Sequence, residues 1–344
     1  MNYATLEARL LTLLARQPCE LRDAEFNELA LAIHRFQREH NEPYRQSCEF
    51  QKTPSDLADW RQIPSVPTSA FRHAALRAFP ETEVRATFRT SGTTGEGFGS
   101  HHFRSPALYE ASILHGWANL GVPALPQVIL TQRPADAPHS SLSYMMGTLG
   151  RLAPQTWCLD AGGQLDLPKL RQAVESGPVL ILGTALAFLH LFEQLRSQPI
   201  PLAPGSLAME TGGYKGTGRS LAKADLYEQF RHSLGLLPDS IINEYSMTEL
   251  SSQWYTRGLG RPHLGPAWAR ALIVNPETGR EVEPGQSGII RLFDLANLGS
   301  VIAIQTQDLA IRRDNGFELL GRDPAAIPRG CSRSADELLS RDSA

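Results

Sequence analysis

A run of small hydroxyl residues and glycines is the stretch of this sequence best suited to hold phosphate. It reads Thr90-Ser91-Gly92-Thr93-Thr94-Gly95. Glycines let successive backbone N–H groups turn toward one point, and hydroxyls add donors that carry no charge. The run is neither a Walker loop nor a dinucleotide fingerprint. Because surface loops also favour these residue types, an ordinary loop is the alternative interpretation.

A helix is expected directly after this loop. Ser105 and Pro106 stand there as a possible N-cap and first helical position.

Two further clusters lie where strands are expected to end. In the first, Gly212 and Gly213 would let a flat ligand approach the backbone closely. Lys215 follows and could pair with an anion, although a lone loop lysine is most often a solvated side chain. The second cluster is Asn243–Glu249, in which a carboxylate beside a hydroxyl can hold Mg²⁺ and a phosphate together. An ordinary turn is the alternative for this second cluster.

Two charged positions come later in the chain. Asp308 follows the apolar run Val301–Ile304, and an aspartate there can accept hydrogen bonds from a ribose diol. Gly321-Arg322-Asp323 is the last cluster of interest.

The composition restricts the class of protein. Of the 344 residues, 42% are hydrophobic and 20% are charged, so one large domain or two smaller ones can bury a full core. The net charge of −3 and the lack of a basic cluster make nucleic acid an improbable partner. No apolar run approaches the roughly 20 residues of a membrane span. The four cysteines show no CxxC spacing, so neither a zinc site nor a disulfide framework is expected. This use of cysteine fits a reducing cytoplasm best.

Hydrophobic periodicity predicts an α/β fold. Helices are expected at 4–16 and 22–40, followed by an extended crossing that is rich in proline. Between 106 and 244, helical segments alternate with short apolar runs at 127–131, 156–159, 178–182, 206–210 and 240–244. Such alternation implies a parallel sheet covered on both faces, with ligands beyond the carboxyl ends of its strands.

The pattern changes after Pro266. Short β runs at 269–274, 287–293, 301–304 and 309–320 predict a small antiparallel subdomain, with a turn at Asn315-Gly316. We therefore expect four regions: a helical segment at 1–50, an α/β core carrying the hydroxyl-rich loop at 51–265, the β subdomain at 266–322, and a tail at 323–344.

The order of these motifs resembles that of adenylate-forming enzymes. The hydroxyl-rich loop is followed by Tyr245-Ser246-Met247-Thr248-Glu249, then by Asp308, then by Gly321-Arg322-Asp323. Within that superfamily, three segments look like the acyl-protein synthetases of bacterial luminescence, called LuxE-like: Glu210–Gly216, Asn243–Gln253 and Pro328–Ser332. The resemblance spans roughly residues 60 to 340 and implies an α/β fold like the N-terminal domain of those enzymes.

The resemblance also implies a role for each matched residue. Thr90, Ser91, Gly92, Thr93, Thr94 and Gly95 would hold the β- and γ-phosphates of ATP. Gly212, Gly213 and Tyr245 would flank the adenine. Thr248 would touch the α-phosphate, Glu249 would coordinate Mg²⁺, and Asp308 would bind the ribose with Arg322 nearby. Cys331 would accept the acyl group as a thioester.

The chain departs from the superfamily pattern near its end. Larger members continue into a mobile C-terminal domain that supplies a catalytic lysine, and we expect that domain to be largely absent here. Lys215, Arg322 or Arg329 is then the candidate for the missing cation.

The expected reaction is the ATP-dependent activation of a carboxylic acid, by resemblance a fatty acid, to an acyl-AMP. The acyl group would pass to Cys331 and then to a partner such as an acyl reductase or another acceptor protein. Two alternatives stay open: a ligase that uses coenzyme A directly, and a non-catalytic nucleotide-binding partner protein.

Overall fold

The chain forms two compact units in the computed structural model. The structure describes residues 2–16, 20–90, 97–212 and 221–322. The first unit comprises Met1–Asn119, Met247–Gln253 and Pro262–Ala344, and the second comprises Leu120–Ser246 and Trp254–Arg261. This division differs from the expected boundaries at residues 50 and 265, because the N-terminal helices and the C-terminal strands share one core.

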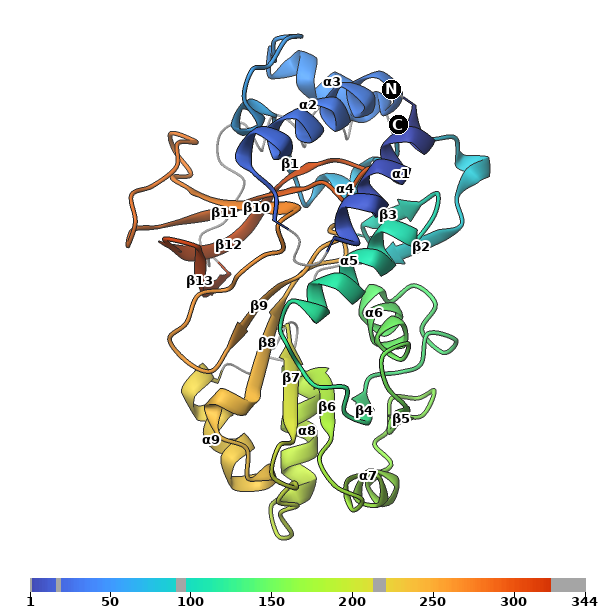
Figure 1. Cartoon of the computed structure of the whole chain (residues 1–344), viewed down its shortest axis with the longest axis vertical. Helices are drawn as coiled ribbons and strands as arrows, with labels where there is room; N and C mark the ends of the chain where they lie inside the picture. Colours follow the sequence, from blue (N-terminus) through green and yellow to red (C-terminus); the bar gives the residue numbers. More distant parts are fainter. Residues whose placement is uncertain (1, 17–19, 91–96, 213–220, 323–344) are drawn as a thin grey trace. The chain divides into compact units, whose positions relative to one another are not determined.

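The first unit is built on a five-stranded sheet (Figure 1). Its strands are β1 (Val66–Pro67), β10 (Ala269–Val274), β11 (Ser287–Asp294), β12 (Ala303–Arg313) and β13 (Gly316–Arg322). Strands β10 to β13 pair in antiparallel fashion, as the sequence predicts, whereas β1 runs parallel to β12. The prediction that the β runs at 301–304 and 309–320 are separate strands, with a break between 304 and 309, is wrong. Polar side chains interrupt the apolar run there, but the backbone continues as one strand with shifts in pairing.

Helices at the start of the chain cover this sheet. They are α1 (Tyr3–Leu14), α2 (Asp23–His40) and α3 (Glu42–Phe50), followed by η1 (Trp60–Gln62), α4 (Ala70–His73) and η2 (Glu81–Glu83). The first two confirm the expected periodicity. The ring of Trp60 lies 5.2 Å from that of Phe26 in α2 and 4.8 Å from that of Phe293 in β11. These contacts explain why residues 1–50 belong to the sheet's own core.

A β-hairpin carries the hydroxyl-rich loop. Strand β2 (Ala86–Arg89) pairs in antiparallel fashion with β3 (Ser100–Phe103), so residues 90–99 connect the two strands. Strand β3 is not expected from the sequence, in which Ser105 and Pro106 predict a helix directly after the loop. Helix α5 (Ala107–Ala118) begins after that strand, with Pro106 at the N-cap and the Ser105 hydroxyl accepting from the Ala107 N–H.

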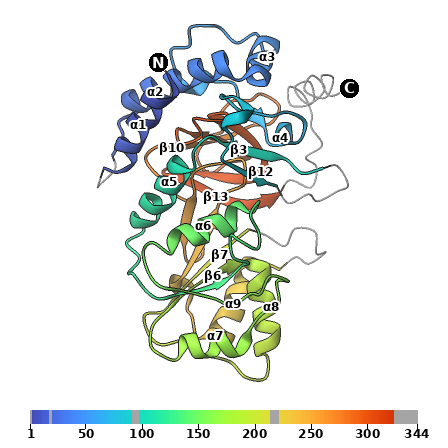
Figure 2. The same cartoon turned by 90° about the vertical axis from the view of Figure 1, so that its right-hand side faces the viewer.

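The second unit is a six-stranded sheet in the order β5-β4-β6-β7-β8-β9 (Figures 1 and 2). The strands are β4 (Gln127–Leu130), β5 (Gln155–Trp157), β6 (Leu180–Thr184), β7 (Leu207–Thr211), β8 (Ile241–Tyr245) and β9 (Trp254–Arg257). The first five are parallel, which confirms the prediction, and β9, which was not expected, is antiparallel to β8.

Helices accompany these strands. They are α6 (Ser141–Leu149), α7 (Leu167–Val174), α8 (Ala185–Leu195), α9 (Lys223–Leu234) and η3 (Pro238–Ser240). Leucine and phenylalanine side chains of α7, α8 and α9 pack against Val128, Ile181 and Ala208 of the sheet in one core. The apolar strands are thereby buried, which is why they read as continuous hydrophobic runs.

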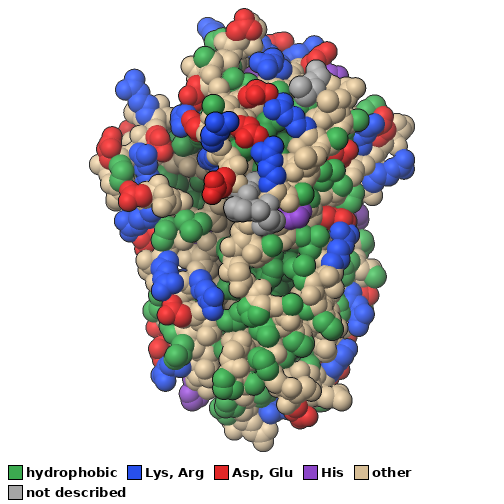
Figure 3. Space-filling model, viewed as in Figure 1, with side chains coloured by type: hydrophobic (Ala, Val, Ile, Leu, Met, Phe, Trp, Pro, Cys, Tyr) green, Lys and Arg blue, Asp and Glu red, His purple; other side chains and the backbone are tan. Residues whose placement is uncertain are grey.

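The surface carries charges of both signs. Figure 3 shows lysine and arginine side chains interspersed with aspartate and glutamate on the face drawn, in keeping with the net charge of −3. Within the described ranges, no helix combines the length and the apolar character that a membrane crossing requires.

Candidate functional site

The base of the hydroxyl-rich loop is closed by Thr90. Its backbone N–H donates to the Gly99 carbonyl at 2.9 Å, and its Oγ1 accepts from the Gly99 N–H at 2.9 Å. A Cβ at Gly99 would meet the Thr90 side chain at 3.1 Å, so the glycine permits this closure. The other predicted phosphate-binding residues, Ser91 to Gly95, lie outside the described residues.

Thr248 contacts both strands of the same hairpin. Its Oγ1 lies 3.5 Å from the Arg89 carbonyl oxygen, at the end of β2. Its own carbonyl accepts from Nδ1 of His101, on β3, at 2.8 Å. Two motifs separated by about 150 residues in the sequence are thus adjacent in the first unit. This adjacency is what the motif order led us to expect, although the role of each residue stays a prediction.

Glu249 is 8% exposed, and its backbone is also held. Its carbonyl accepts from Nδ2 of Asn297 at 2.8 Å, while Oδ1 of the same asparagine accepts from the Ser251 hydroxyl at 2.6 Å. Asn297 belongs to none of the motifs seen in the sequence.

Asp294 fixes Ser251 and Ser252, which come shortly after Glu249 in the sequence. Its carboxylate accepts from the Ser251 N–H at 2.9 Å, the Ser252 hydroxyl at 2.7 Å and the Ala296 N–H at 3.0 Å. Complete burial raises the pKa of Asp294 to about 6, although these hydrogen bonds favour the carboxylate. The indole Nε1 of Trp268 lies 3.0 Å from the Ser252 hydroxyl and completes the network.

The two residues predicted to be near the ribose face each other on adjacent strands. Asp308 of β12 pairs in register with Arg322 of β13, and the Asp308 N–H donates to the Thr306 hydroxyl at 3.1 Å. The side chain of Arg322 lies outside the described residues.

The second unit holds the predicted adenine residues. Gly212 directly follows β7 with a φ of 72°, a backbone conformation that favours glycine, and no atom of the described residues would crowd a Cβ there. Tyr245 is the buried last residue of β8 and pairs with Trp254 of β9. Gly213 and Lys215 lie outside the described residues.

Two buried carboxyl groups occupy adjacent strands of this unit. Glu210 of β7 is paired with Nζ of Lys223 at 2.9 Å, and burial raises its pKa. Glu244 of β8 accepts from the Thr211 hydroxyl, but its Oε1 has no hydrogen-bond partner in the part of the chain that the structure describes. Burial raises the pKa of Glu244 to about 7. An acidic residue near the end of an apolar strand was the signal for both in the sequence.

Neither described cysteine is suited to nucleophilic attack. Cys48 and Cys158 are free and buried, and desolvation raises the pKa of each thiol to about 11. A thiol of that kind stays protonated at neutral pH. Cys19 and Cys331 lie outside the described residues.

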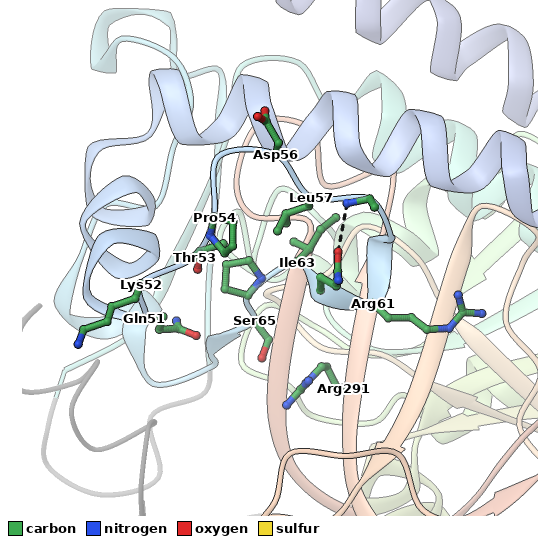
Figure 4. A pocket seen from close by; sticks show the side chains of 13 residues that line it. Gln51, Lys52, Thr53, Pro54, Asp56, Leu57, Arg61, Ile63, Ser65 and Arg291 are labelled. Carbon is green, nitrogen blue, oxygen red and sulfur yellow. Dashed lines mark hydrogen bonds between the residues drawn. The ribbon is translucent and has the colours of Figure 1, made fainter.

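The first unit also contains a hollow of about 430 Å³, drawn in Figure 4. None of the predicted site residues lines it. Of its three cations, Lys52 is exposed, Arg61 is paired with Asp59, and Arg291 donates to the Gln305 side chain at 3.0 Å. We therefore assign it no part in nucleotide binding.

Glu249 is the residue predicted to hold a magnesium ion. No group of three or more His, Cys, Asp or Glu side chains is arranged for a metal within the described ranges. Mg²⁺ is commonly held by one or two carboxylates together with substrate phosphates rather than by a protein cage. A single carboxylate beside a predicted phosphate site is compatible with that mode.

Comparisons with known proteins agree with the motif order. No family model matches the chain. The long-chain-fatty-acid–luciferin-component ligase of Aliivibrio fischeri is 23% identical over 331 residues, covering 89% of this chain and 86% of the relative. The ligase of the same name from Vibrio harveyi is 22% identical over 333 residues, covering 91% and 88%.

A solved structure matches the fold. An open conformation of 2-hydroxyisobutyryl-CoA ligase, in complex with 2-HIB-AMP and CoA, superposes with a TM-score of 0.68 at 18% sequence identity. The match covers 88% of this chain and 70% of that one. The sequence relatives and the shared fold lead to one conclusion. The chain is similar to these luciferin-component ligases along about nine tenths of its length, shares its fold with 2-hydroxyisobutyryl-CoA ligase, and is an acid-activating ligase.

Proposed function

We propose that this ligase activates a fatty acid as acyl-AMP and then carries the acyl group on Cys331 as a thioester. The observation that supports the first step is the contact of Thr248 with the base of the hydroxyl-rich loop. Activation is needed because a carboxylate is a poor acyl donor. A carboxylate oxygen attacks the α-phosphorus of ATP, a P–O bond forms, and pyrophosphate leaves with the electrons of the broken bond.

Each predicted residue has a part in that step. Residues 90–95 would hold the β- and γ-phosphates, Thr248 the α-phosphate and Asp308 the ribose, while Gly212, Gly213 and Tyr245 would bind the adenine. Glu249 would hold Mg²⁺, which when bound offsets the negative charge of the phosphates. Such a site works by positioning the reactants and by electrostatic stabilisation.

A cation is still needed near the developing charge. Lys215, Arg322 and Arg329 lie within segments that resemble the family, and we propose one of them for that role.

In the second step the Cys331 thiolate would attack the acyl carbonyl carbon. A C–S bond forms and AMP leaves with the electrons of the broken C–O bond. Support comes from the two cysteines that the structure describes: Cys48 and Cys158 are buried with thiol pKa values raised to about 11, so they are poor candidates. Arg329 and Arg333 flank Cys331 and would favour its thiolate.

The thioester would then pass to an acyl-acceptor protein, for which we propose an acyl reductase that releases an aldehyde. The relatives' names, long-chain-fatty-acid–luciferin-component ligases, motivate a long-chain fatty acid as the substrate.

A screen of pyrophosphate release over fatty and aryl acids tests the proposal. We expect release that depends on ATP, Mg²⁺ and a fatty acid, together with an enzyme-bound acyl group that hydroxylamine removes. ATP binding without acid-dependent release would contradict it. Release that requires coenzyme A would instead point to a ligase of the coenzyme-A type.

A further inference from the structure

Resting on that proposed function, we propose that His101 and Asn297 are positioning residues. They hold the carbonyls of Thr248 and Glu249, and so aim the two side chains that bind the α-phosphate and Mg²⁺. Neither residue belongs to the matched motifs.

His101 acts as a fixed neutral donor. It is 2% exposed on β3, and its ring packs against those of Phe71 and Phe103, with centroids 5.7 and 4.2 Å away. Burial lowers the pKa of His101 to about 4, so the ring is neutral at physiological pH. Because the Thr248 carbonyl can only accept, Nδ1 must carry the proton, and the tautomer is set.

Asn297 is fixed more completely. Nδ2 donates to the Glu249 carbonyl at 2.8 Å and to the Val301 carbonyl at 3.1 Å. Both partners are acceptors, which fixes the orientation of the amide, and Oδ1 accepts from the Ser251 hydroxyl. The asparagine is therefore held on both sides of its amide.

The loop that carries Asn297 is anchored in turn by helix α2. Nε2 of Gln37 donates to the carbonyls of Asn297 and Leu298 at 2.9 and 3.1 Å, and its Oε1 accepts from the Ile302 N–H at 2.9 Å. Gln37 is itself fully buried. A chain of hydrogen bonds thus connects helix α2, through Gln37 and Asn297, to the backbone of Glu249.

Two consecutive peptide carbonyls are fixed by this arrangement. The two peptide planes flank the Cα of Glu249 and so set its Cα–Cβ direction, while the Cα of Thr248 lies in the first plane and the hydroxyl of Thr248 also contacts the Arg89 carbonyl. A displacement of about 1 Å at a reacting group can lower a rate by roughly 10²-fold, so such fixation bears on catalysis. Hydrogen bonds that served the core alone would affect stability without affecting the turnover of the folded enzyme.

A pair of nearly isosteric variants separates the two roles. His101→Asn keeps an N–H near the position of Nδ1, whereas His101→Leu has a similar shape and no donor. Both lose the ring contacts equally. We expect His101→Leu to lower kcat/KM for ATP in acid-dependent ATP–pyrophosphate exchange by about tenfold, the equivalent of one lost hydrogen bond, and His101→Asn to restore most of it.

Equal activity of folded His101→Leu and His101→Asn would overturn the proposal. If His101→Leu does not fold, Asn297→Asp replaces it. Its carboxylate cannot donate to the Glu249 carbonyl, so the Mg²⁺ concentration that gives half-maximal exchange should rise above that of wild type. An unchanged Mg²⁺ dependence in the folded variant would count against the proposal.

Different results would contradict the proposed function and the positioning proposal. Absence of exchange by wild type with every acid would contradict the proposed function. The positioning proposal would then be tested by measuring ATP affinity with calorimetry. His101→Leu should bind ATP more weakly than His101→Asn, and equal affinities would overturn the positioning proposal.

Discussion

The side-chain amide of Asn297 donates to the backbone carbonyl of Glu249 across 2.8 Å, although the two residues are 48 positions apart. The proposed magnesium ligand is thus held by a loop that no motif marks. Asp294, the last residue of β11 just before that loop, accepts from Ser251 and Ser252, so the backbone of the site depends on these buried polar residues.

The first prediction concerns Glu249 itself. Glu249→Gln keeps the shape of the side chain but removes the charge that would hold Mg²⁺, so pyrophosphate release should fall by about 10²-fold or more. The measurement is release as a function of Mg²⁺ concentration. Glu277→Gln, at an exposed turn, is the matched control and should behave as wild type. Comparable loss in both variants would remove the assigned role.

The second prediction concerns the acyl acceptor. Cys331→Ser should release pyrophosphate at the wild-type rate in the first turnover but form no hydroxylamine-sensitive acyl-enzyme, because an oxygen ester is far less sensitive than a thioester. Labelling with radioactive acid measures this. Cys158→Ala should still be labelled, and label that persists in Cys331→Ser through a thioester would contradict the assignment.

The third prediction is a pH dependence of stability. Burial raises the pKa of Glu244 from 4.5 to about 7, so the folded state keeps a proton that the unfolded state releases. The stabilisation is complete below pH 4.5 and is lost as the pH rises through 7, by on the order of 3 kcal/mol at most.

Glu244→Gln tests this directly, since an amide has no charge to bury. The variant should match wild type near pH 5 and be more stable at pH 8, as measured by urea unfolding. A difference between the two proteins that stays constant from pH 5 to 8 would show that Glu244 does not titrate in this range.

The fourth prediction concerns Asp294. Asp294→Ala leaves the Ser251 N–H, the Ala296 N–H and the Ser252 hydroxyl without their acceptor, which should lower the free energy of unfolding by about 3 kcal/mol. Asp56→Ala, at an exposed position, should cost less than about 0.5 kcal/mol. Urea denaturation compares them, and similar midpoints would mean that the network contributes little.

The sequence predicts the parts of this fold that have a local signal. The runs that became β4, β6, β7 and β8 are apolar and bounded by helices, so their parallel pairing could be predicted. Strand β3 reads Ser-His-His-Phe and has little β character, because its stability comes from pairing with β2 and from the packing of His101.

The site could be predicted only in part for the same reason. Thr248 and Glu249 carry a motif, but the side chains that hold their carbonyls do not. His101 and Asn297 act through hydrogen bonds to the backbone of residues 147 and 48 positions away, and such contacts leave no periodicity or spacing in the sequence. Nothing in the sequence indicates that residues 247–253 belong to the first unit. That placement depends on hydrogen bonds with Asp294 and Asn297.

A crystal structure with a non-hydrolysable ATP analogue and Mg²⁺ tests the central claim most directly. The account predicts that the α-phosphate lies within hydrogen-bond distance of the Thr248 hydroxyl and that the remaining phosphates contact the loop closed by Thr90 and Gly99. A triphosphate seated instead in the hollow beside Arg291, away from Thr248, would contradict it.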